Sequence, residues 1–371
     1  MRRTLFDDIE SAPSSYSSVQ LDRDKFVELL NELDNQDDVI PLRNKTLELK
    51  QIIASHDGVP LTDAGSNGNV VSLRRDVLSS ELDQILEART IERARYYIKR
   101  LERGVNKVKT SKLNDINLHR WKEHTEIITD SLWVLPKRDA TGAHLGWYWG
   151  NFIPQIPHQL MLRYTKKGDW VLDPFVGSGT TLIECRRLGR NGIGIELNGE
   201  VASRAEELVG QERNRHSVRT AIVTGDARTI DARRTLDSFD AKQVQLLIMH
   251  PPYHDIISFS EDDKDLSNAT STDEFLKMFG ETLDNIDPVL ERGRYFALVI
   301  GDKYSKGDWI PLGFHCMSEV LHRAYSLKSI VVKNFEETRA KRDQKQLWRY
   351  RALAGGFYIF KHEYIFIFKK K

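Results

Sequence analysis

The segment Trp170-Val-Leu-Asp-Pro-Phe-Val-Gly-Ser-Gly-Thr-Thr181 decides the fold of this chain. A short apolar run ends in an acid and a proline, passes through two glycines, and leads into residues 182–188, whose apolar side chains recur at helical spacing. Glycines at positions 177 and 179 permit backbone conformations that other residues avoid, and they let a ligand approach the main chain closely. The pattern predicts a strand, a tight turn and a helix, with Thr180 and Thr181 as candidate caps of that helix.

A second strand is predicted at 192–196, where Gly-Ile-Gly-Ile leads to Glu196. In nucleotide-binding strand–helix–strand units, an acid about 20 residues after the first strand accepts a hydrogen bond from a ribose hydroxyl. The dinucleotide fingerprint would need a third glycine where this chain has Leu182. Since no pyrophosphate then has to be held, Asp173, which would repel a phosphate, could instead bind an amine.

These residues together form a pattern of known type. The run Asp-Pro-Phe-x-Gly-Ser-Gly-Thr-Thr, followed by a Gly-x-Gly-x-Glu strand, resembles the S-adenosyl-L-methionine site of the amino-group DNA methyltransferases. The resemblance implies that Phe152 and Pro154 border the methionine end of the cofactor and that Asp226 lies near its adenine amino group. An acid that ends a strand is also an ordinary helix cap, so Asp226 has two interpretations. The expected cofactor-binding residues are Asp173, Pro174, Phe175, Gly177, Ser178, Gly179, Thr180, Thr181, Glu196, Asp226, Phe152 and Pro154.

A second motif, His250-Pro251-Pro252-Tyr253, follows an apolar run at 245–249. Ligands of open parallel sheets lie beyond the carboxyl ends of the strands, so this motif and the glycine turn are expected to share one cleft. The resembled family carries Asp, Asn or Ser before its Pro-Pro-Tyr. Such a side chain, together with a main-chain carbonyl, accepts hydrogen bonds from the exocyclic amine of a base, while the tyrosine stacks on a base swung out of the duplex.

His250 departs from the family pattern. Neutral imidazole has one acceptor nitrogen and can replace a carboxylate or amide oxygen, whereas imidazolium has none. We therefore expect methyl transfer to weaken as the pH falls through about 6.5, the ordinary pKa of histidine. The alternative is a histidine that caps a buried turn in a catalytically inactive relative.

Composition narrows the class of protein. The 371 residues carry a net charge of +1, so no global field attracts nucleic acid and any basic surface must be local. Two cysteines exclude a disulfide framework and are too few for a zinc site, so no metal is expected. No apolar run approaches the roughly 20 residues that span a bilayer, and the N-terminus lacks the apolar core of a signal peptide. A cytoplasmic protein without membrane contact is expected.

Two regions are expected. Residues 1–140 read as mainly helical, with amphipathic patterns over 21–56 and over 79–108, and without an evident internal repeat. Residues 141–371 form an α/β domain in which strands alternate with helices, which favours a doubly wound, mostly parallel sheet. The resemblance, which covers about 146–371, implies the Rossmann-like methyltransferase fold with seven strands and an antiparallel last strand. The seven strands are expected near 170–173, 192–196, 221–226, 245–249, 295–300, 329–333 and 363–368.

Two basic segments are candidate nucleic-acid surfaces. Residues 93–109 combine basic side chains, Arg95 and Lys99 among them, with two tyrosines, although a solvated helix face with its tyrosines in the core is slightly favoured. Residues 334–351, expected to form a loop, interleave basic residues with Trp348 and Tyr350, a composition typical of a nucleic-acid surface, with a solvated connection as the alternative. The candidates in this loop are Arg339, Lys341, Arg342, Lys345, Arg349 and Arg351.

The resemblance implies an enzyme that transfers a methyl group from S-adenosyl-L-methionine to an exocyclic amine of double-stranded DNA, with adenine N6 slightly favoured over cytosine N4. Only about 70 residues separate the two motifs, too few for an inserted target-recognition domain. A nuclease activity, as in restriction–modification, would need a separate restriction or defence-system subunit. Two alternatives stay open: an RNA or tRNA guanine-amino methyltransferase, and an inactive DNA-binding subunit with a methyltransferase fold.

Overall fold

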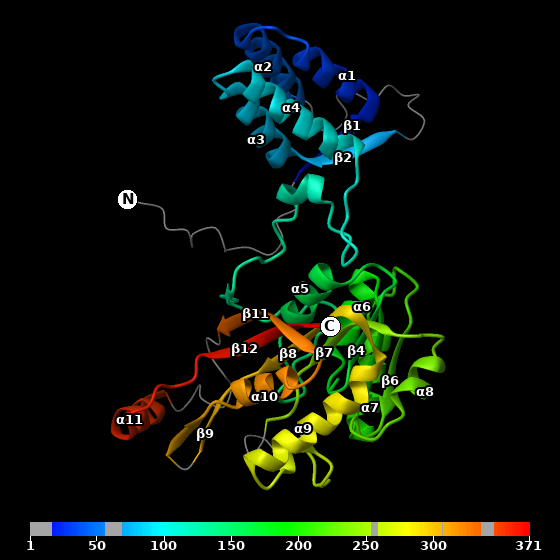
Figure 1. Ribbon diagram of the computed structural model, residues 1–371, viewed down its shortest axis with the longest axis vertical. Helices are drawn as coiled ribbons and strands as arrows, with labels where there is room; N and C mark the ends of the chain where they lie inside the picture. The colour runs from blue at the N-terminus through cyan, green and yellow to red at the C-terminus, as the bar shows by residue number, and fades with distance from the viewer. Residues whose placement is uncertain (1–16, 56–68, 254–258, 306, 335–344) are drawn as a thin grey trace. The chain divides into compact units, whose positions relative to one another are not determined.

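The computed structural model describes residues 17–55, 69–253, 259–305, 307–334 and 345–371 (Figure 1). The chain divides into two compact units: one comprises residues up to Ser111 together with Ile116–Glu126, and the other comprises Lys112–Asp115 and Ile127–Lys371. Residues 127–140, which we grouped with the N-terminal region, lie in the second unit because strand β3 (Leu132–Trp133) pairs with its sheet. Among the described helices, none combines the length and the apolar character needed to cross a membrane.

The second unit is built on an eight-stranded sheet with the order β3-β11-β12-β8-β7-β4-β5-β6. All seven expected strands are present, and the last one, β12, runs antiparallel to both neighbours while the others are mutually parallel. This confirms the Rossmann-like fold, to which the short parallel strand β3 adds an eighth member at one edge. The further strands are β4 (Trp170–Asp173), β5 (Asn191–Glu196), β6 (Thr220–Thr224), β7 (Val244–Met249), β8 (Leu290–Ile300), β11 (Tyr325–Asn334) and β12 (His362–Lys370).

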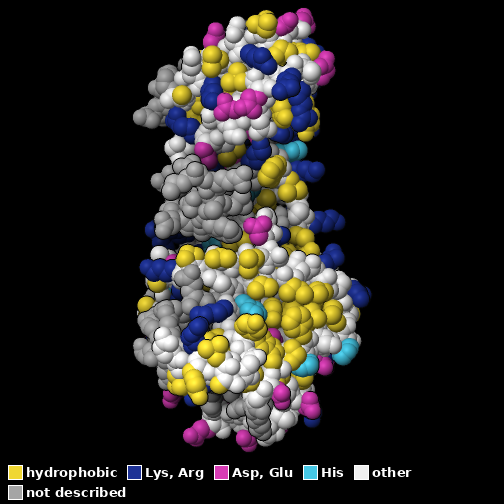
Figure 2. Space-filling model, turned by 90° about the vertical axis from the view of Figure 1, so that its left-hand side faces the viewer, with side chains coloured by type: hydrophobic (Ala, Val, Ile, Leu, Met, Phe, Trp, Pro, Cys, Tyr) yellow, Lys and Arg dark blue, Asp and Glu magenta, His cyan; other side chains and the backbone are white. Residues whose placement is uncertain are grey.

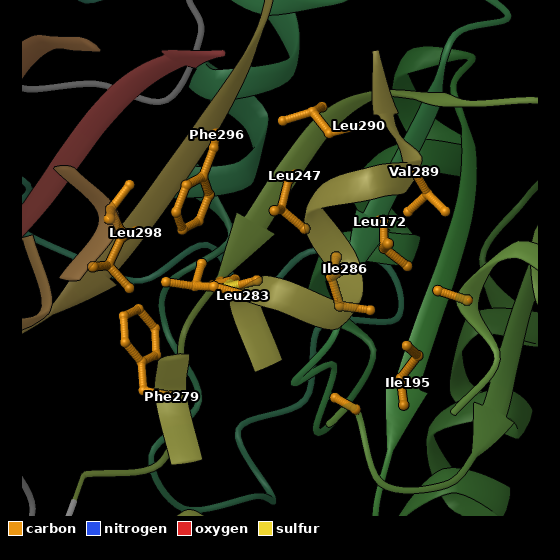
Figure 3. Packing of buried hydrophobic residues seen from close by; sticks show 14 of the residues in the cluster. Leu172, Ile195, Leu247, Phe279, Leu283, Ile286, Val289, Leu290, Phe296 and Leu298 are labelled. Atoms are coloured by element: carbon orange, nitrogen blue, oxygen red, sulfur yellow. The ribbon is translucent and has the colours of Figure 1, made fainter. Parts of the chain in front are cut away.

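Helices bury both faces of this sheet, because its central strands are apolar on both sides. One apolar cluster joins α5 (Gln155–Tyr164), α6 (Thr180–Leu188) and α7 (Gly199–Gln211) to one face. The other cluster joins α8 (Ala232–Asp237), α9 (Thr272–Ile286) and α10 (Leu312–Leu321) to the opposite face. Figure 3 shows side chains of α9 lying against strand residues such as Leu247 and Phe296.

The strand order places the site. The chain moves outward from β4 to β5 and β6, and then returns to the other side of β4 with β7 and β8. At such a reversal the loops after neighbouring strands diverge and leave a crevice at the carboxyl ends of the strands. The glycine turn follows β4 and the His-Pro-Pro-Tyr motif follows β7, so both motifs border this crevice. Smaller elements complete the unit: β9 (Lys303–Ser305), β10 (Asp308–Ile310), α11 (Lys345–Gly355) and the 3₁₀ turns η2 (Leu266–Asn268) and η3 (Asp287–Val289).

The first unit consists of two strand–helix–helix segments whose strands pair antiparallel. The helical pattern expected over 79–108 is divided between two helices: α3 ends at Leu86, and Thr90 caps α4 by accepting a hydrogen bond from the backbone N–H of Arg93. One segment contains β1 (Ser18–Asp22), α1 (Arg23–Asp34) and α2 (Val39–Ser55); the other contains β2 (Val70–Arg74), α3 (Arg75–Leu86) and α4 (Ile91–Asn106), followed by the 3₁₀ turn η1 (Leu118–Glu123).

These two segments form an internal repeat that the sequence analysis missed. A shift of 52 residues relates their buried positions: Val19 to Val71, Leu21 to Leu73, and Leu30 to Leu82. The same shift relates backbone hydrogen bonds, since Arg23 N donates to Asn69 O and Arg75 N donates to Ser17 O. The repeat was hidden because it preserves the buried apolar positions and few of the polar ones.

Candidate active site

The glycine turn is held by hydrogen bonds from its main-chain N–H groups to the end of β5. The N–H of Val176 donates to the carbonyl of Ile195, and the N–H of Gly177 donates to Glu196 Oε2 at 3.0 Å. Gly177 and Gly179 have φ angles of +49° and +81°, values that favour glycine. A Cβ atom on Gly179 would lie 2.7 Å from Val209 Cγ2. Glycine is therefore required at 179 both for conformation and for space.

Asp173, the last residue of β4, holds the turn through both of its carboxylate oxygens. Its Oδ1 accepts from the N–H of Phe175 at 3.0 Å, and its Oδ2 accepts from Thr181 Oγ1 at 2.5 Å. Burial raises the pKa of this carboxyl to about 7. The expected capping role of both threonines is wrong, because the N-cap of α6 is Gly179, which provides no side-chain hydrogen bond. The Thr180 hydroxyl instead donates to Asn151 Oδ1. The hydroxyls fasten the turn to its surroundings.

The missing third glycine of the dinucleotide fingerprint is compensated on the next strand. Leu182 occupies that place, and its Cδ2 lies 2.5 Å from where a Cβ on Gly192 would be. A Cβ on Gly194 would similarly lie within 2.6 Å of Val176. Close packing of helix α6 against strand β5 thus depends on glycines in β5 rather than on a glycine in α6.

One cavity of about 770 Å³ brings the two motifs together. We call residues 174–180 with Glu196 the turn wall, and His250–Tyr253 with Lys333 and Glu363 the Pro-Pro wall. Several expected residues do not line the cavity: Asp173, Gly179 and Thr181 lie behind the turn, and Pro154 begins α5. The expected residues that do line it are Pro174, Phe175, Gly177, Ser178, Thr180, Glu196, Asp226, Phe152, His250, Pro251, Pro252 and Tyr253.

Two carboxylates lie at the turn-wall end of the cavity. Glu196 accepts from the backbone N–H groups of Gly177 and Asn198, both at 3.0 Å, and burial raises its pKa. Asp226, at the end of β6, receives a bidentate contact from Arg228, with Nη2 to Oδ2 at 2.8 Å. Asp226 is therefore neutralised by a neighbouring guanidinium, which leaves Glu196 as the less compensated acceptor.

His250 stands at the centre of the Pro-Pro wall. Its ring centroid lies 5.1 Å from that of Phe152 and 5.7 Å from that of Tyr253. Burial, with a smaller contribution from Lys333, lowers the pKa of His250 to about 3. This corrects the expected loss of activity near pH 6.5, because the ring stays neutral and keeps its acceptor nitrogen well below that pH.

Tyr253 is fastened to the end of β8. Its hydroxyl accepts from the N–H of Gly301 at 2.9 Å, and burial raises its pKa well above the ordinary value. The hydroxyl oxygen lies 3.4 Å from His250 Nε2, a long distance for a hydrogen bond between these atoms. His250 Nε2 is therefore only weakly engaged by the described residues of the protein itself.

The sequence analysis missed several residues that line the cavity. Lys333 Nζ and Glu363 Oε1 form a buried ion pair at 3.0 Å, and burial raises the pKa of Glu363. The sequence contained one indication of this pair, since each is a charged residue within a largely apolar predicted strand. In the structure the two residues are direct partners in the β11–β12 register. The stacked rings of Tyr148 and Phe259 and the side chains of Arg138 and Asn151 had no such signal, since they lie in loops.

A cluster of Asp139, His144 and Glu184 lies outside the cavity. One potential ligand atom of each residue lies within 4.8 Å of the others, a spacing compatible with a metal ion. Arg187 also reaches this cluster, with Nη1 at 3.1 Å from Asp139 Oδ2 and 3.3 Å from Glu184 Oε1. His158 Nδ1 donates to the second carboxylate oxygen of Glu184 at 2.7 Å. The arginine already supplies the positive charge that a metal would bring, so this cluster is an ion-pair network.

The expected nucleic-acid residues have varied outcomes. Arg95 donates to the carbonyls of Asp34 and Gln36, and Lys99 Nζ lies 3.4 Å from Asp34, so both close the end of α1. The expected loop 334–351 is helical from Lys345, where α11 exposes Arg349 and Arg351, the latter over the Trp348 ring. Arg339, Lys341 and Arg342 lie outside the described residues, as does the side chain of Lys345.

Basic side chains are dispersed on the face of the molecule drawn in Figure 2. Among the described residues on that face, lysines and arginines lie beside acidic and apolar side chains in both units. This distribution agrees with the net charge of +1. Attraction to a polyanion must therefore come from local clusters rather than from the molecule as a whole.

Comparison with known proteins gives one family. The N6/N4 methyltransferase family, described as DNA methylase, matches residues 67–207. Type II methyltransferase M.MjaII from Methanocaldococcus jannaschii is 47% identical over 51 residues, which are 14% of this chain and 10% of that protein. M.XycI from Xanthomonas campestris pv. cyanopsidis is 39% identical over 85 residues, or 23% of this chain and 27% of that protein. M.HpaI from Haemophilus parainfluenzae is 46% identical over 56 residues, 15% of this chain and 18% of that protein.

These similarities cover less than a third of each named relative's length, and the family match ends before His250. Among solved structures, TrmN from Thermus thermophilus has a TM-score of 0.39 at 16% identity and covers 59% of this chain and 49% of its own. A SAM-dependent methyltransferase from Methanosarcina mazei has a TM-score of 0.36 at 14% identity, with 55% and 93% covered. The assignment of the fold rests on the strand order described above.

Proposed function

We propose that this chain, which is similar to the N6/N4 DNA methylase family over residues 67–207, transfers a methyl group from S-adenosyl-L-methionine to an exocyclic amine of a base in double-stranded DNA. The observation that carries the proposal is the single cavity between the turn wall and the Pro-Pro wall. Its volume, about 770 Å³, lies in the range of small-molecule and cofactor sites. Were the two walls to face different cavities, methyl donor and acceptor could not meet.

The turn wall fits the cofactor. Close approach of a ligand to the main chain is possible where the chain has Gly177 and Ser178, and Glu196 can accept from a ribose hydroxyl. Phe152 borders the cavity beside His250, as expected for a residue between cofactor and base. When bound, S-adenosyl-L-methionine would supply a methyl group made electrophilic by a positively charged sulfur.

The Pro-Pro wall would activate the amine. The lone pair of an exocyclic amine is delocalised into the ring, so hydrogen bonds from the amine to acceptors favour the pyramidal form that attacks a methyl group. His250 Nε2 and the carbonyls beside Pro251 and Pro252 are the acceptors we assign to this role. Because Tyr253 holds Nε2 only at 3.4 Å, a substrate amine can replace that contact.

The residues at the base end of the cavity bear on which base is methylated. The base end of the cavity holds both a cation and a carboxylate, in Lys333 and Glu363. This pair can accept from the amine of adenine or of cytosine and donate to the adjacent ring nitrogen, so it favours neither base. We retain adenine N6 as the first target to be tested and cytosine N4 as the second.

A direct assay tests the proposal. The full chain is incubated with S-adenosyl-L-methionine carrying a labelled methyl group and with unmethylated genomic DNA or, separately, total RNA, and the nucleic acid is digested to nucleosides. We expect label in N6-methyladenine or N4-methylcytosine from DNA. Label in a methylated guanine from RNA would support the alternative substrate, and cofactor binding without any product would indicate an inactive DNA-binding subunit.

A further inference from the structure

The N-terminal unit presents a two-stranded ribbon with one apolar and one polar face. Val19, Leu21, Val71 and Leu73 are all at most 6% exposed and belong to the core beneath the ribbon. The side chains between them, Ser18, Gln20, Val70 and Ser72, are exposed on the outward face. Since side chains of a strand alternate between faces, the ribbon turns a row of largely polar groups to solvent.

The ribbon lies on a local twofold axis. Gln20 and Ser72, which are 52 residues apart and are therefore equivalent in the repeat, are direct partners in the strand register. The helices also pack across the repeats, since α1 packs against α4 and α2 against α3, beside the contact of α3 with α4 within the second repeat. Arginines obey the same symmetry: Arg43 donates to the carbonyl of Ala88 and Arg95 to that of Gln36. The two repeats of one chain are therefore arranged like the two subunits of a symmetric dimer, with the ribbon at the axis.

We propose that the outward face of the β1–β2 ribbon enters the major groove of duplex DNA and reads bases there. The major groove, about 12 Å wide, admits a two-stranded ribbon, and other DNA-binding proteins place strands in it. Glutamine forms bidentate contacts with adenine, and serine contacts any base. This inference rests on the proposed function for the identity of the partner. It assigns base recognition to the N-terminal unit, because the roughly 70 residues between the two motifs are too few for an inserted target-recognition domain.

The polar groups are ordered before any partner binds. Gln20 Nε2 donates to Ser72 Oγ at 3.1 Å across the axis. This contact leaves the amide oxygen of Gln20 and the hydroxyl proton of Ser72 free for a base. One end of the ribbon is engaged, since Arg74 Nη1 donates to the Glu123 carbonyl at 3.0 Å and Arg120 reaches the Ser72 carbonyl at the strand edge. Neither contact covers the outward face.

Charge distinguishes the two repeats. Residues 69–111 contain ten basic and six acidic side chains, whereas residues 17–55 contain five basic and eight acidic ones. Contacts to phosphates, which carry most of the affinity and make it salt-dependent, are therefore assigned to the second repeat. A symmetric ribbon flanked by unequal charges suits a target whose two halves are not identical.

The decisive variant removes the outward polar groups without touching the core. Gln20→Ala with Ser72→Ala is compared with Gln51→Ala plus Ser80→Ala, which deletes the same groups from exposed helical positions of the same unit. Duplexes preferred by the full wild-type chain are selected from a randomised library, and binding is measured by fluorescence anisotropy at fixed salt. Thermal unfolding of both variants should match that of the wild type.

We expect the ribbon variant to bind the selected duplex about 10- to 100-fold more weakly, the loss of one or two base contacts. Binding to an unrelated duplex, and binding by the matched helical variant, should each stay within about twofold. Duplex RNA should not compete, because its major groove is too narrow for the ribbon. Unchanged preference of the ribbon variant, absence of any preferred duplex, or competition by duplex RNA would each overturn the inference. Binding needs no methyl transfer, so failure of the proposed function would appear separately, as absence of methylated product.

Discussion

The turn wall and the Pro-Pro wall face each other across one cavity but are built differently. The turn wall is local: its residues come from one strand–turn–helix segment and one neighbouring strand, and its carboxylate, Glu196, accepts from main-chain N–H groups. The Pro-Pro wall joins β7 to β11 and β12, and its carboxylate, Glu363, is paired with the Lys333 side chain of a neighbouring strand. Damage to the first should affect cofactor binding and folding together, whereas damage to the second should separate binding from catalysis.

The largest effect is expected from His250→Ala. Loss of the acceptor should lower the turnover rate by about 10² to 10⁴-fold, the usual contribution of a positioned proton acceptor. Affinity for S-adenosyl-L-methionine, measured by calorimetry, should stay within about twofold because the turn wall is intact. His250→Asn, which keeps an acceptor oxygen, should recover part of the rate, and the exposed His322→Ala serves as the control. A His250→Ala enzyme with wild-type turnover would remove His250 from the mechanism.

The buried pair of the Pro-Pro wall gives the next test. Lys333→Met leaves the Glu363 carboxylate buried without its partner, which should lower the free energy of unfolding by about 3–5 kcal/mol. Adding Glu363→Leu should restore most of that loss, because an apolar pair of similar size avoids the cost of burying charge. Urea unfolding measures both. Lys277→Met, at an exposed pair on α9, should cost less than about 1 kcal/mol, and an equal loss at both sites would contradict the assignment.

The difference between the walls also explains what could be predicted from the sequence. Asp173 to Thr181 were found because a contiguous motif encodes a local structure, and the strands were found because buried strands are contiguous apolar runs. Lys333 and Glu363 were missed because they become partners only through the pairing of two strands, which brings together residues 30 positions apart in the sequence. The pKa of His250 depends on burial, which no spacing of residues reveals.

Glycine at 179 tests the rigidity of the turn wall. Gly179→Ala places a Cβ in a left-handed conformation and within 2.7 Å of Val209, so it should lower the free energy of unfolding by about 1–3 kcal/mol. The same change should weaken cofactor binding, in contrast to His250→Ala. Gly210→Ala is the matched control, since that helical position is open and should be neutral or slightly stabilised. A Gly179→Ala protein with wild-type stability and cofactor affinity would show that the turn can relax.

The smallest effects, taken per pH unit, are those of pH, and Asp173 and His250 should differ in their sign. The pKa of Asp173 is raised to about 7 in the folded state, so the folded chain binds a proton that the unfolded chain has released, and stability is lost as the pH rises from about 4 to 7. The pKa of His250 is lowered to about 3, so stability is lost as the pH falls from about 6.5 towards 3. Each group contributes at most about 1.4 kcal/mol per pH unit. In urea unfolding between pH 5 and 8, Asp173→Asn should gain stability relative to the wild type as the pH rises, and His250→Asn should gain as it falls. Identical pH profiles for the wild type and both variants would mean that neither group is held in the protonation state that its burial imposes.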